Sequence, residues 1–294
     1  MEKVRTPRAA VPDRGRLLVT CADKPGIVAG VTQFLLREGA NVVHLDEHTT
    51  DPVGGTFFMR IEFDLEGLPS RLEEFRRSFA PVARQFGMDW QVHLASVPKR
   101  LAIFVSREDH CLLELLWRWR AGDLPVEISM VISNHPDLRE TVEAWGFPYH
   151  HVPFLPEQKG DAERTQLSLV DGKVDLIVLA RYMQVLSPPF VARWPHRILN
   201  IHHGFLPAFQ GARPYDQAHA RGVKLIGATA HYVTEDLDQG PIVEQAVERV
   251  DHRQSVEDLK RIGRYVERVV LARAVGWHVE DRVLVHGKKT VVFP

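Results

Sequence analysis

Two kinds of hydrophobic pattern alternate along the N-terminal third of the chain. Segments with alternating apolar positions predict four strands, at residues 17–20, 41–47, 57–63 and 88–94. Apolar residues three and four positions apart predict two helices, one from Ile27 to the residues before Gly39 and one over 72–86. The order strand-helix-strand-strand-helix-strand is the ferredoxin-like plan, an antiparallel sheet with helices on one face.

The pattern changes after a short linker at residues 97–100. Unbroken apolar runs now alternate with stretches of helical spacing, the runs being 101–105, 126–132 and 174–180. Such strands form a mostly parallel, Rossmann-like sheet that is covered on both faces, and its ligands sit beyond the carboxyl ends of the strands. We therefore expect an α/β chain with a flexible tail, a first domain, the linker and a second domain, at residues 1–15, 16–96, 97–100 and 101–294.

Composition narrows the class of partner. The 37 lysines and arginines balance 38 acidic residues, for a net charge of −1, which argues against a nucleic acid and favours a small molecule. Two cysteines, Cys21 and Cys111, are too few for a disulfide framework and favour a reducing, cytoplasmic location. No apolar run approaches the ~20 residues that span a bilayer, and residues 1–16 lack the apolar core of a secretory signal.

Candidate chemistry lies at the ends of two predicted strands. Asn200 and His202 stand two residues apart after the apolar run 197–199, so alternation points both side chains to one side. The strand 226–233 leads into an acidic turn that contains Asp238. An amide, an imidazole and a carboxylate are the groups needed to attack a carbonyl and hold the oxyanion. Alternation should turn the next residue, His203, away from that carbonyl, where it orients another group or is structural.

The first domain resembles a known family of regulatory modules. Residues 23–29 and 38–42 resemble those of an ACT domain, and the resemblance covers 16–96. In that family the loop that here contains Asp23, Pro25 and Gly26 borders an amino-acid site, often where two copies meet. The resemblance implies an amino-acid effector and a homo-oligomer, either a dimer or a tetramer. The loop could instead only shape a tight turn, so ligand binding and pure dimerisation both stay open.

The second domain has longer matching motifs. The segments that resemble a folate-dependent formyltransferase catalytic domain are 200–203, 205–209, 211–215, 227–233 and 237–241. With the ACT-like domain in front, the chain resembles the family of formyltetrahydrofolate deformylases. That family implies hydrolysis of 10-formyltetrahydrofolate to formate and tetrahydrofolate, which supplies formate for purine synthesis and restores the free folate. It implies folate as substrate, with no cofactor and no metal.

The resemblance also assigns roles to residues. The family's catalytic trio falls on Asn200, His202 and Asp238. Asp238 is expected to orient and deprotonate water, His202 to stabilise the tetrahedral oxygen and help protonate N10, and Asn200 to donate a hydrogen bond. At Gly204 the chain departs from the family pattern, where a hydroxyl residue is frequent, so a water relay through that hydroxyl is not carried over.

Substrate-binding residues follow from two further segments. The backbone at Val185 and Leu186 is expected to pair with the pterin edge, and the loop 234–238 to close the other side. The expected binding residues are Met183, Gln184, Val185, Leu186, Thr234, Glu235 and Asp236. Ser187 is also expected to cap a helix that begins at Pro188.

The main question left open is whether water or an amine acceptor is the nucleophile. A glycinamide ribonucleotide transformylase cradles a phosphate after its first strand, typically with glycines. Here the loop 106–111 has no glycine and presents Glu108 and Asp109, which would repel a phosphate and leave water as the nucleophile. The second reading is a formyltransferase to an amine acceptor, on a sugar nucleotide or on initiator methionyl-tRNA. The tRNA enzyme would need a basic C-terminal domain, for which little chain follows the helix 256–279.

Two other classes of protein fit part of the sequence. A zinc hydrolase would draw ligands from His202, His203, His231 and Asp238, but adjacent histidines on an extended strand converge poorly on one ion. An amino-acid sensor with a non-catalytic second domain is disfavoured because the whole trio is present. Residues 150–151, both histidines, are expected to be structural or to line a pocket, and His44 and His48 to lie at the surface of the first domain.

Overall fold

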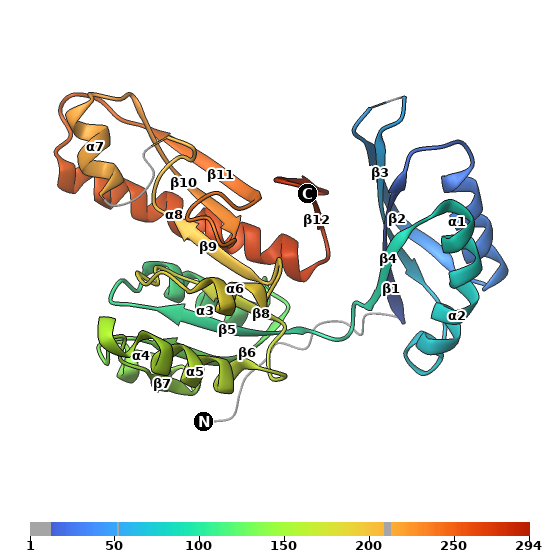
Figure 1. Cartoon of the computed structure of the whole chain (residues 1–294), viewed down its shortest axis with the longest axis horizontal. Helices are drawn as coiled ribbons and strands as arrows, with labels where there is room; N and C mark the ends of the chain where they lie inside the picture. Colours follow the sequence, from blue (N-terminus) through green and yellow to red (C-terminus); the bar gives the residue numbers. More distant parts are fainter. Residues whose placement is uncertain (1–12, 52, 209–212) are drawn as a thin grey trace. The chain divides into compact units, whose positions relative to one another are not determined.

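A computed structural model describes residues 13–51, 53–208 and 213–294, which divide into two compact units (Figure 1). The first contains the described residues up to Pro98 together with Glu280–Leu284 and Val291–Pro294. The second contains Lys99–Val279 and Val285–Thr290. Most of the expected tail lies outside the described residues, but the first strand already begins at Arg14, so the tail was placed slightly too long.

The first unit has the expected ferredoxin-like fold. Its elements are β1 (Arg14–Ala22), α1 (Ile27–Arg37), β2 (Asn41–Thr49), β3 (Thr56–Asp64), α2 (Leu68–Phe86) and β4 (Asp89–Leu94). The strands pair antiparallel in the order β2-β3-β1-β4. Both helices cover one face, where the ring of Phe34 packs edge-on against Phe75 and Phe79, with centroids 5.2 and 5.1 Å apart.

The second unit is built on a seven-stranded, mostly parallel sheet, as expected. Its elements are β5 (Lys99–Val105), α3 (His110–Ala121), β6 (Val126–Ser133), α4 (Arg139–Ala144), β7 (Tyr149–His151), the 3₁₀ turn η1 (Pro156–Gln158), α5 (Lys159–Val170), β8 (Leu176–Leu179), α6 (Pro188–Ala192), β9 (Ile198–His202), α7 (Pro214–Ala220), β10 (Leu225–Tyr232), β11 (Ile242–Arg249) and α8 (Val256–Val279). The strand order is β11-β10-β9-β8-β5-β6-β7, parallel from β9 to β7 and antiparallel at β10 and β11. A two-stranded hairpin of β12 (Val283–His286) and β13 (Lys289–Val292) follows.

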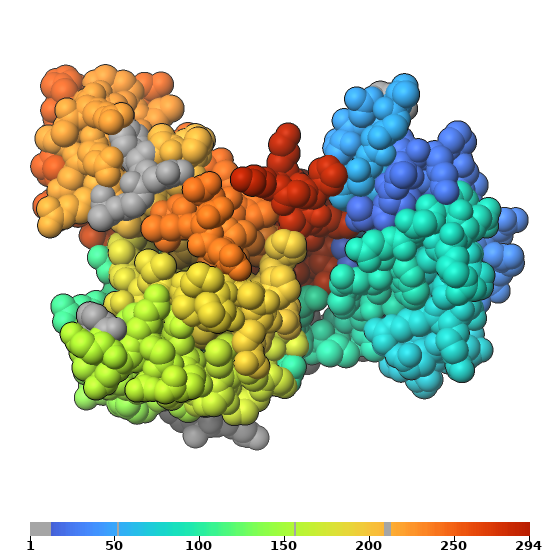
Figure 2. Space-filling model, viewed as in Figure 1, coloured from blue at the N-terminus to red at the C-terminus, as the bar shows by residue number. Residues whose placement is uncertain are grey.

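Helices cover the large sheet because both of its faces are apolar. Helices α5 and α6 contribute Val170 and Phe190 to a core that includes Phe104 of β5 and Ile132 of β6. Helix α8 packs against α3 and against β9, β10 and β11. Figure 2 shows α4 and α5 at the surface of this unit, in yellow-green. Among the described residues, no helix is both long and apolar enough to cross a bilayer.

The first unit also contains Glu280–Leu284 and Val291–Pro294, which follow α8, so residues 101–294 do not form one domain as expected. Arg60 of β3 is fully buried and donates hydrogen bonds of 2.9 Å to the backbone oxygens of Glu280 and Asp281. Leu284 and Phe293 pack with apolar residues of β1 and β3, Leu18 and Phe58. Phe58 and Arg60 alternate with the residues that face α1 and α2, so this contact covers the second face of the small sheet.

Candidate active site

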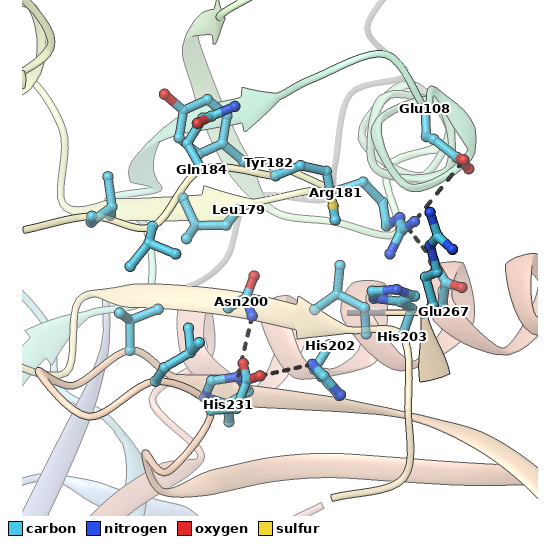
Figure 3. Close-up of a pocket in the computed structure, with 18 of the residues that line it drawn as sticks. Glu108, Leu179, Arg181, Tyr182, Gln184, Asn200, His202, His203, His231 and Glu267 are labelled. Carbon is cyan, nitrogen blue, oxygen red and sulfur yellow. Dashed lines mark hydrogen bonds and ion pairs between the residues drawn. The ribbon is translucent and has the colours of Figure 1, made fainter. Parts of the chain in front are cut away.

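A cavity of about 760 Å³ opens at the carboxyl ends of β8 and β9 in the second unit (Figure 3). It is lined by every residue predicted to be catalytic or substrate-binding, namely Asn200, His202, Asp238, Met183, Gln184, Val185, Leu186, Thr234, Glu235 and Asp236. The fold thus brings together residues as far apart in the sequence as Met183 and Asp238. Their individual roles stay predictions.

His202 and Asp238 form the central contact of this cavity. His202 Nδ1 lies 3.3 Å from Asp238 Oδ2, and their side chains are 5% and 9% exposed. His202 is the last residue of β9, whereas Asp238 lies in the turn after β10 with a left-handed φ of 56°. A shielded carboxylate beside an imidazole can exchange a proton with a reactant and then stabilise the charge that results.

His231 connects Asn200 to the carboxylate. Its Nδ1 lies 3.0 Å from the backbone oxygen of Tyr232, which can only accept, so Nδ1 carries the proton. Nε2 is then an acceptor for the Asn200 Nδ2 amide at 3.2 Å, and it lies 3.7 Å from Asp238 Oδ1. Burial lowers the pKa of His231, which keeps this tautomer neutral. His231 was expected only as an alternative zinc ligand, so its contact with Asn200 was not predicted.

The turn that carries Asp238 is tightly constrained. A Cβ added at Gly240 would lie 1.7 Å from the backbone oxygen of Tyr232, so only glycine fits there. The Thr234 hydroxyl donates to the backbone oxygen of Asp236 over 3.2 Å. These contacts fix the path of the chain between β10 and β11 and hold the carboxylate against His202.

The segment expected to bind the pterin, residues 183–186, is fixed by hydrogen bonds with neighbouring residues. Ser106 Oγ accepts a 3.0 Å hydrogen bond from the Met183 amide and donates one of 2.7 Å to Asn134 Oδ1. Ser187 caps α6, as expected, by accepting from the Phe190 amide. The Met183 and Val185 side chains remain 55% and 56% exposed. The segment therefore combines a fixed backbone with an open apolar surface.

Gly204 leaves room for the imidazole of His202. A Cβ at this position would lie 2.9 Å from His202 Nε2, closer than real Cβ contacts allow. The Gly204 carbonyl accepts from the buried Thr229 hydroxyl over 2.9 Å, and that hydroxyl oxygen accepts from the Leu206 amide over 3.0 Å. The loop after β9 is thus anchored where it passes His202. The rest of its motif, residues 209–212, lies outside the described residues.

The opposite end of the cavity holds charged residues that the sequence analysis did not single out. Arg181 Nε lies 3.3 Å from Glu267 Oε2, and Glu267 also accepts from Tyr215 Oη over 2.6 Å. A Cβ at Gly263 would overlap Tyr215, so this glycine of α8 allows the approach. His203 lines the cavity too, because β9 has already ended at His202 and strict alternation no longer applies.

Three side chains are close enough together to share a metal ion. Within the part of the chain that the structure describes, His110, Cys111 and Glu267 have ligand atoms within 4.8 Å of one another. Burial raises the pKa of the Cys111 thiol well above its usual value, which disfavours the thiolate that a cation needs. The carboxylate already pairs with Arg181. This group therefore suits a charge network better than a metal.

The remaining predicted positions lie elsewhere. His150 and His151 are in β7, while His44 and His48 are on β2, which is largely exposed. In the first unit Asp23 accepts a 3.0 Å hydrogen bond from the Thr49 hydroxyl, and Gly26 precedes α1 with a left-handed φ of 94°. The loop with Pro25 is thus a well-formed turn, and its ligand stays a prediction.

Comparisons with known proteins agree with this architecture. The family model for formyl transferase matches residues 99–275 and that for the ACT domain matches residues 15–80. A formyltetrahydrofolate deformylase from Bacillus subtilis (strain 168) is 57% identical over 96% of this chain and 94% of its own length. One from Escherichia coli O6:H1 is 41% identical over 94% and 97%.

Solved structures show the same likeness. The crystal structure of a formyltetrahydrofolate deformylase from Pseudomonas syringae pv. tomato has a TM-score of 0.93 and 49% identity, covering 97% of this chain and 96% of that one. Glycinamide ribonucleotide transformylase 1 from Symbiobacterium toebii has a TM-score of 0.64 and 29% identity, covering 69% and 97%. Because likeness to the deformylases extends over both units, the chain belongs to the formyltetrahydrofolate deformylase family.

Proposed function

We propose that this protein hydrolyses 10-formyltetrahydrofolate to formate and tetrahydrofolate, the activity named by its relatives. The observation that carries the proposal is the position of Asp238, 3.3 Å from His202 and 3.7 Å from His231 on the wall of the cavity. A carboxylate between two imidazoles, shielded from bulk solvent, suits the activation of water at a formyl carbonyl.

The chemistry runs in two steps. Asp238 takes a proton from water while the water oxygen attacks the formyl carbon. The electrons of the carbonyl double bond move onto the formyl oxygen. Asn200 and His202 stabilise that oxyanion with N–H groups. The electrons then return as the bond from carbon to N10 breaks and a protonated His202 delivers a proton to N10. Asp238, 3.3 Å from His202, then returns to it the proton taken from water. Formic acid leaves as formate and a proton, so the reaction consumes one water.

His231 supports this sequence without touching the reacting atoms. Its neutral Nε2 accepts from the Asn200 amide, which turns the amide oxygen and nitrogen into one fixed orientation. The pterin ring would lie against the exposed Met183 and Val185, with the backbone at Val185 and Leu186 pairing with its edge. Thr234, Glu235 and Asp236 would close the other side.

The wider role follows from the products. Formate supplies purine synthesis, and free tetrahydrofolate returns to the one-carbon pool. The ACT-like loop at Asp23, Pro25 and Gly26 would bind an amino-acid effector, in a homo-oligomer of two or four copies. A reducing cytoplasm suits the two cysteines, Cys21 and Cys111, which are both buried as free thiols. The chemistry above needs no cofactor.

One assay tests the proposal. The purified full chain is incubated with 10-formyltetrahydrofolate, and formate and tetrahydrofolate are measured with and without added amine. We expect both products in equal amounts, independent of the amine. Release of tetrahydrofolate only when an amine is present would support a formyltransferase instead.

A further inference from the structure

A strained arginine stands at the end of β8. Arg181 adopts a left-handed backbone with φ of 63°, a conformation that costs an ordinary residue about 1 kcal/mol and that glycine adopts freely. It lines the cavity, and its side chain is only 10% exposed. Such an outlier at a functional cavity points to a role for the side chain, since a glycine would relieve the strain.

The side chain enters a buried network of charges. Its Nε lies 3.3 Å from Glu267 Oε2, and one terminal nitrogen lies 4.0 Å from Glu108 Oε1. Glu267 is 1% exposed and also contacts His110 Nε2 at 2.9 Å and Tyr215 Oη at 2.6 Å. Burial alone would raise the pKa of Glu267, but the hydrogen bond from His110 and the charge of Arg181 outweigh it and lower the pKa to about 2. Glu267 therefore stays ionised at neutral pH.

The network occupies one end of the cavity. Figure 3 shows Arg181, Glu108, Glu267 and His203 together on one side, away from Gln184 and Leu179. The segments expected to hold the pterin, 183–186 and 234–236, supply the rest of the wall. An amine acceptor would have to approach the formyl group from the end that the pterin does not use, and there the guanidinium and its two carboxylates stand.

The cations Lys260 and Arg264, here called the rim, do not exclude an anionic acceptor by their charge. Lys260 and Arg264 of α8 line the same cavity, and Lys260 forms a 2.7 Å ion pair with Glu257. A phosphorylated acceptor would meet these cations first. Deeper in the cavity, the volume of the Arg181 side chain and its pairing with carboxylates would block the acceptor.

We propose that the Arg181–Glu267 pair is a specificity determinant, which occupies the acceptor end of the cavity and leaves water as the nucleophile. This inference rests on the hydrolysis proposed above. Without the pair, an amine nitrogen could attack the formyl carbon, the bond to N10 would break, and the proton lost by the amine would pass to N10. The products would then be a formamide and tetrahydrofolate, with no water consumed.

The test measures how the formyl group is partitioned. Wild type, Arg181→Gly and the double variant Arg181→Gly/Glu267→Gln are given 10-formyltetrahydrofolate with glycinamide or phosphoethanolamine, and formate and formylated amine are quantified. Glycine suits the left-handed backbone, and the double variant removes both charges so that neither stays buried alone. His196→Gly is the control, because His196 shares the left-handed φ, at 55°, but does not line the cavity.

We expect wild type and His196→Gly to release formate, and at least one Arg181 variant to raise the ratio of formylated amine to formate about tenfold or more. An unchanged ratio in folded Arg181 variants that still hydrolyse the substrate would overturn the inference and leave the proposed function intact. Formate release by neither wild type nor control would overturn the proposed function. Formylated amine as the main product of wild type would overturn both.

A measurement of phosphate binding tests the same inference independently of turnover. Affinity for inorganic phosphate is measured by calorimetry on wild type and the double variant. We expect the double variant to bind phosphate at least about tenfold more tightly, because the guanidinium no longer fills the site, the carboxylate of Glu267 is gone, and the cations Lys260 and Arg264 remain. Equal affinity, together with an unchanged partition ratio, would refute the inference.

Discussion

His231 lies directly opposite Asn200 in the antiparallel pairing of β10 with β9, and the two side chains meet at 3.2 Å. The next pair but one in the same ladder joins His202 to Thr229. One short strand pairing therefore sets the positions of two predicted catalytic groups and of the residue that orients one of them. The geometry of the site therefore depends on the register in which β10 pairs with β9.

Replacing His231 should lower turnover while substrate binding is largely kept. His231→Leu removes the acceptor for the Asn200 amide, and a buried hydrogen bond of this kind contributes about 1–3 kcal/mol. We expect kcat to fall about tenfold to a hundredfold, with a small change in KM. Steady-state kinetics checks this, with the exposed His252→Leu as control. A kcat within twofold of wild type would show that Asn200 needs no such support.

Asp238 offers a sharper test of the chemistry. Asp238→Asn keeps the size of the side chain but removes the base, so we expect tetrahydrofolate to bind with near-normal affinity and turnover to fall about a thousandfold. Calorimetry and formate release measure the two effects. The surface variant Asp251→Asn makes the same chemical change outside the cavity. Near-normal hydrolysis by Asp238→Asn would remove Asp238 from the mechanism.

Gly204 should resist even the smallest side chain. In Gly204→Ala the new Cβ would stand 2.9 Å from His202 Nε2, and the imidazole must shift. Because small misplacements of a catalytic group are costly, we expect kcat to fall about tenfold or more while the folate still binds. Gly276→Ala, at a position in α8 where an added Cβ meets no atom within 4 Å, controls for a general effect of glycine replacement. Unaltered kcat would mean that His202 has room to move.

Local patterns were enough to predict both folds and to place Asn200, His202 and Asp238 at strand ends that meet in the cavity. Asn200 and His202 follow an apolar strand, and Asp238 follows another, so each could be placed at a strand end from its own segment. Ser187 could be placed as a helix cap for the same reason, since capping is decided within four residues. These predictions depended on short-range chemistry that the order of strands in the sheet does not change.

Residues whose positions depend on long-range packing were missed. The role of His231 depends on its antiparallel register with β9, and that of Glu267 on how α8 lies against α7 and the sheet. Arg181 gave no signal, because nothing in its neighbours indicates a left-handed backbone. The contact of the C-terminal residues with the first unit was not predicted, because it too depends on long-range packing. The apolar Phe58 on the outer face of β3 could have indicated that another segment covers this face.

The buried Arg60 should stabilise the first unit through that C-terminal contact. Arg60→Met leaves the backbone oxygens of Glu280 and Asp281 without their donor and removes the cation beside Glu62, where Arg60 Nη2 lies 2.5 Å from the carboxylate. Losing one partner of a buried charged group costs about 3–5 kcal/mol. Urea unfolding of the full chain should show a loss of this size, which the exposed Arg84→Met should not. An unchanged midpoint would mean that the contact contributes little.

His203 should make the protein less stable in mild acid. Burial, followed by the charge of Arg181, lowers its pKa from 6.5 to about 3, so the folded protein keeps this ring neutral while the unfolded chain protonates it. Its contribution to stability is complete above pH 6.5 and is lost as the pH falls from 6.5 towards 3, at up to about 1.4 kcal/mol per pH unit. Glu267, with its pKa lowered to about 2, adds a loss only below about pH 4.5.

The variant His203→Gln should therefore unfold with a shallower pH dependence between pH 7 and 5 than wild type. Urea titrations at each pH give the two slopes, and the exposed His252→Gln should keep the wild-type slope. Part of the slope should persist in His203→Gln, because the pKa of His231 is lowered by burial as well. Identical slopes for wild type and His203→Gln would mean that the ring is solvated or charged in the folded state, and the cavity end beside Arg181 would then be wetter than its burial indicates.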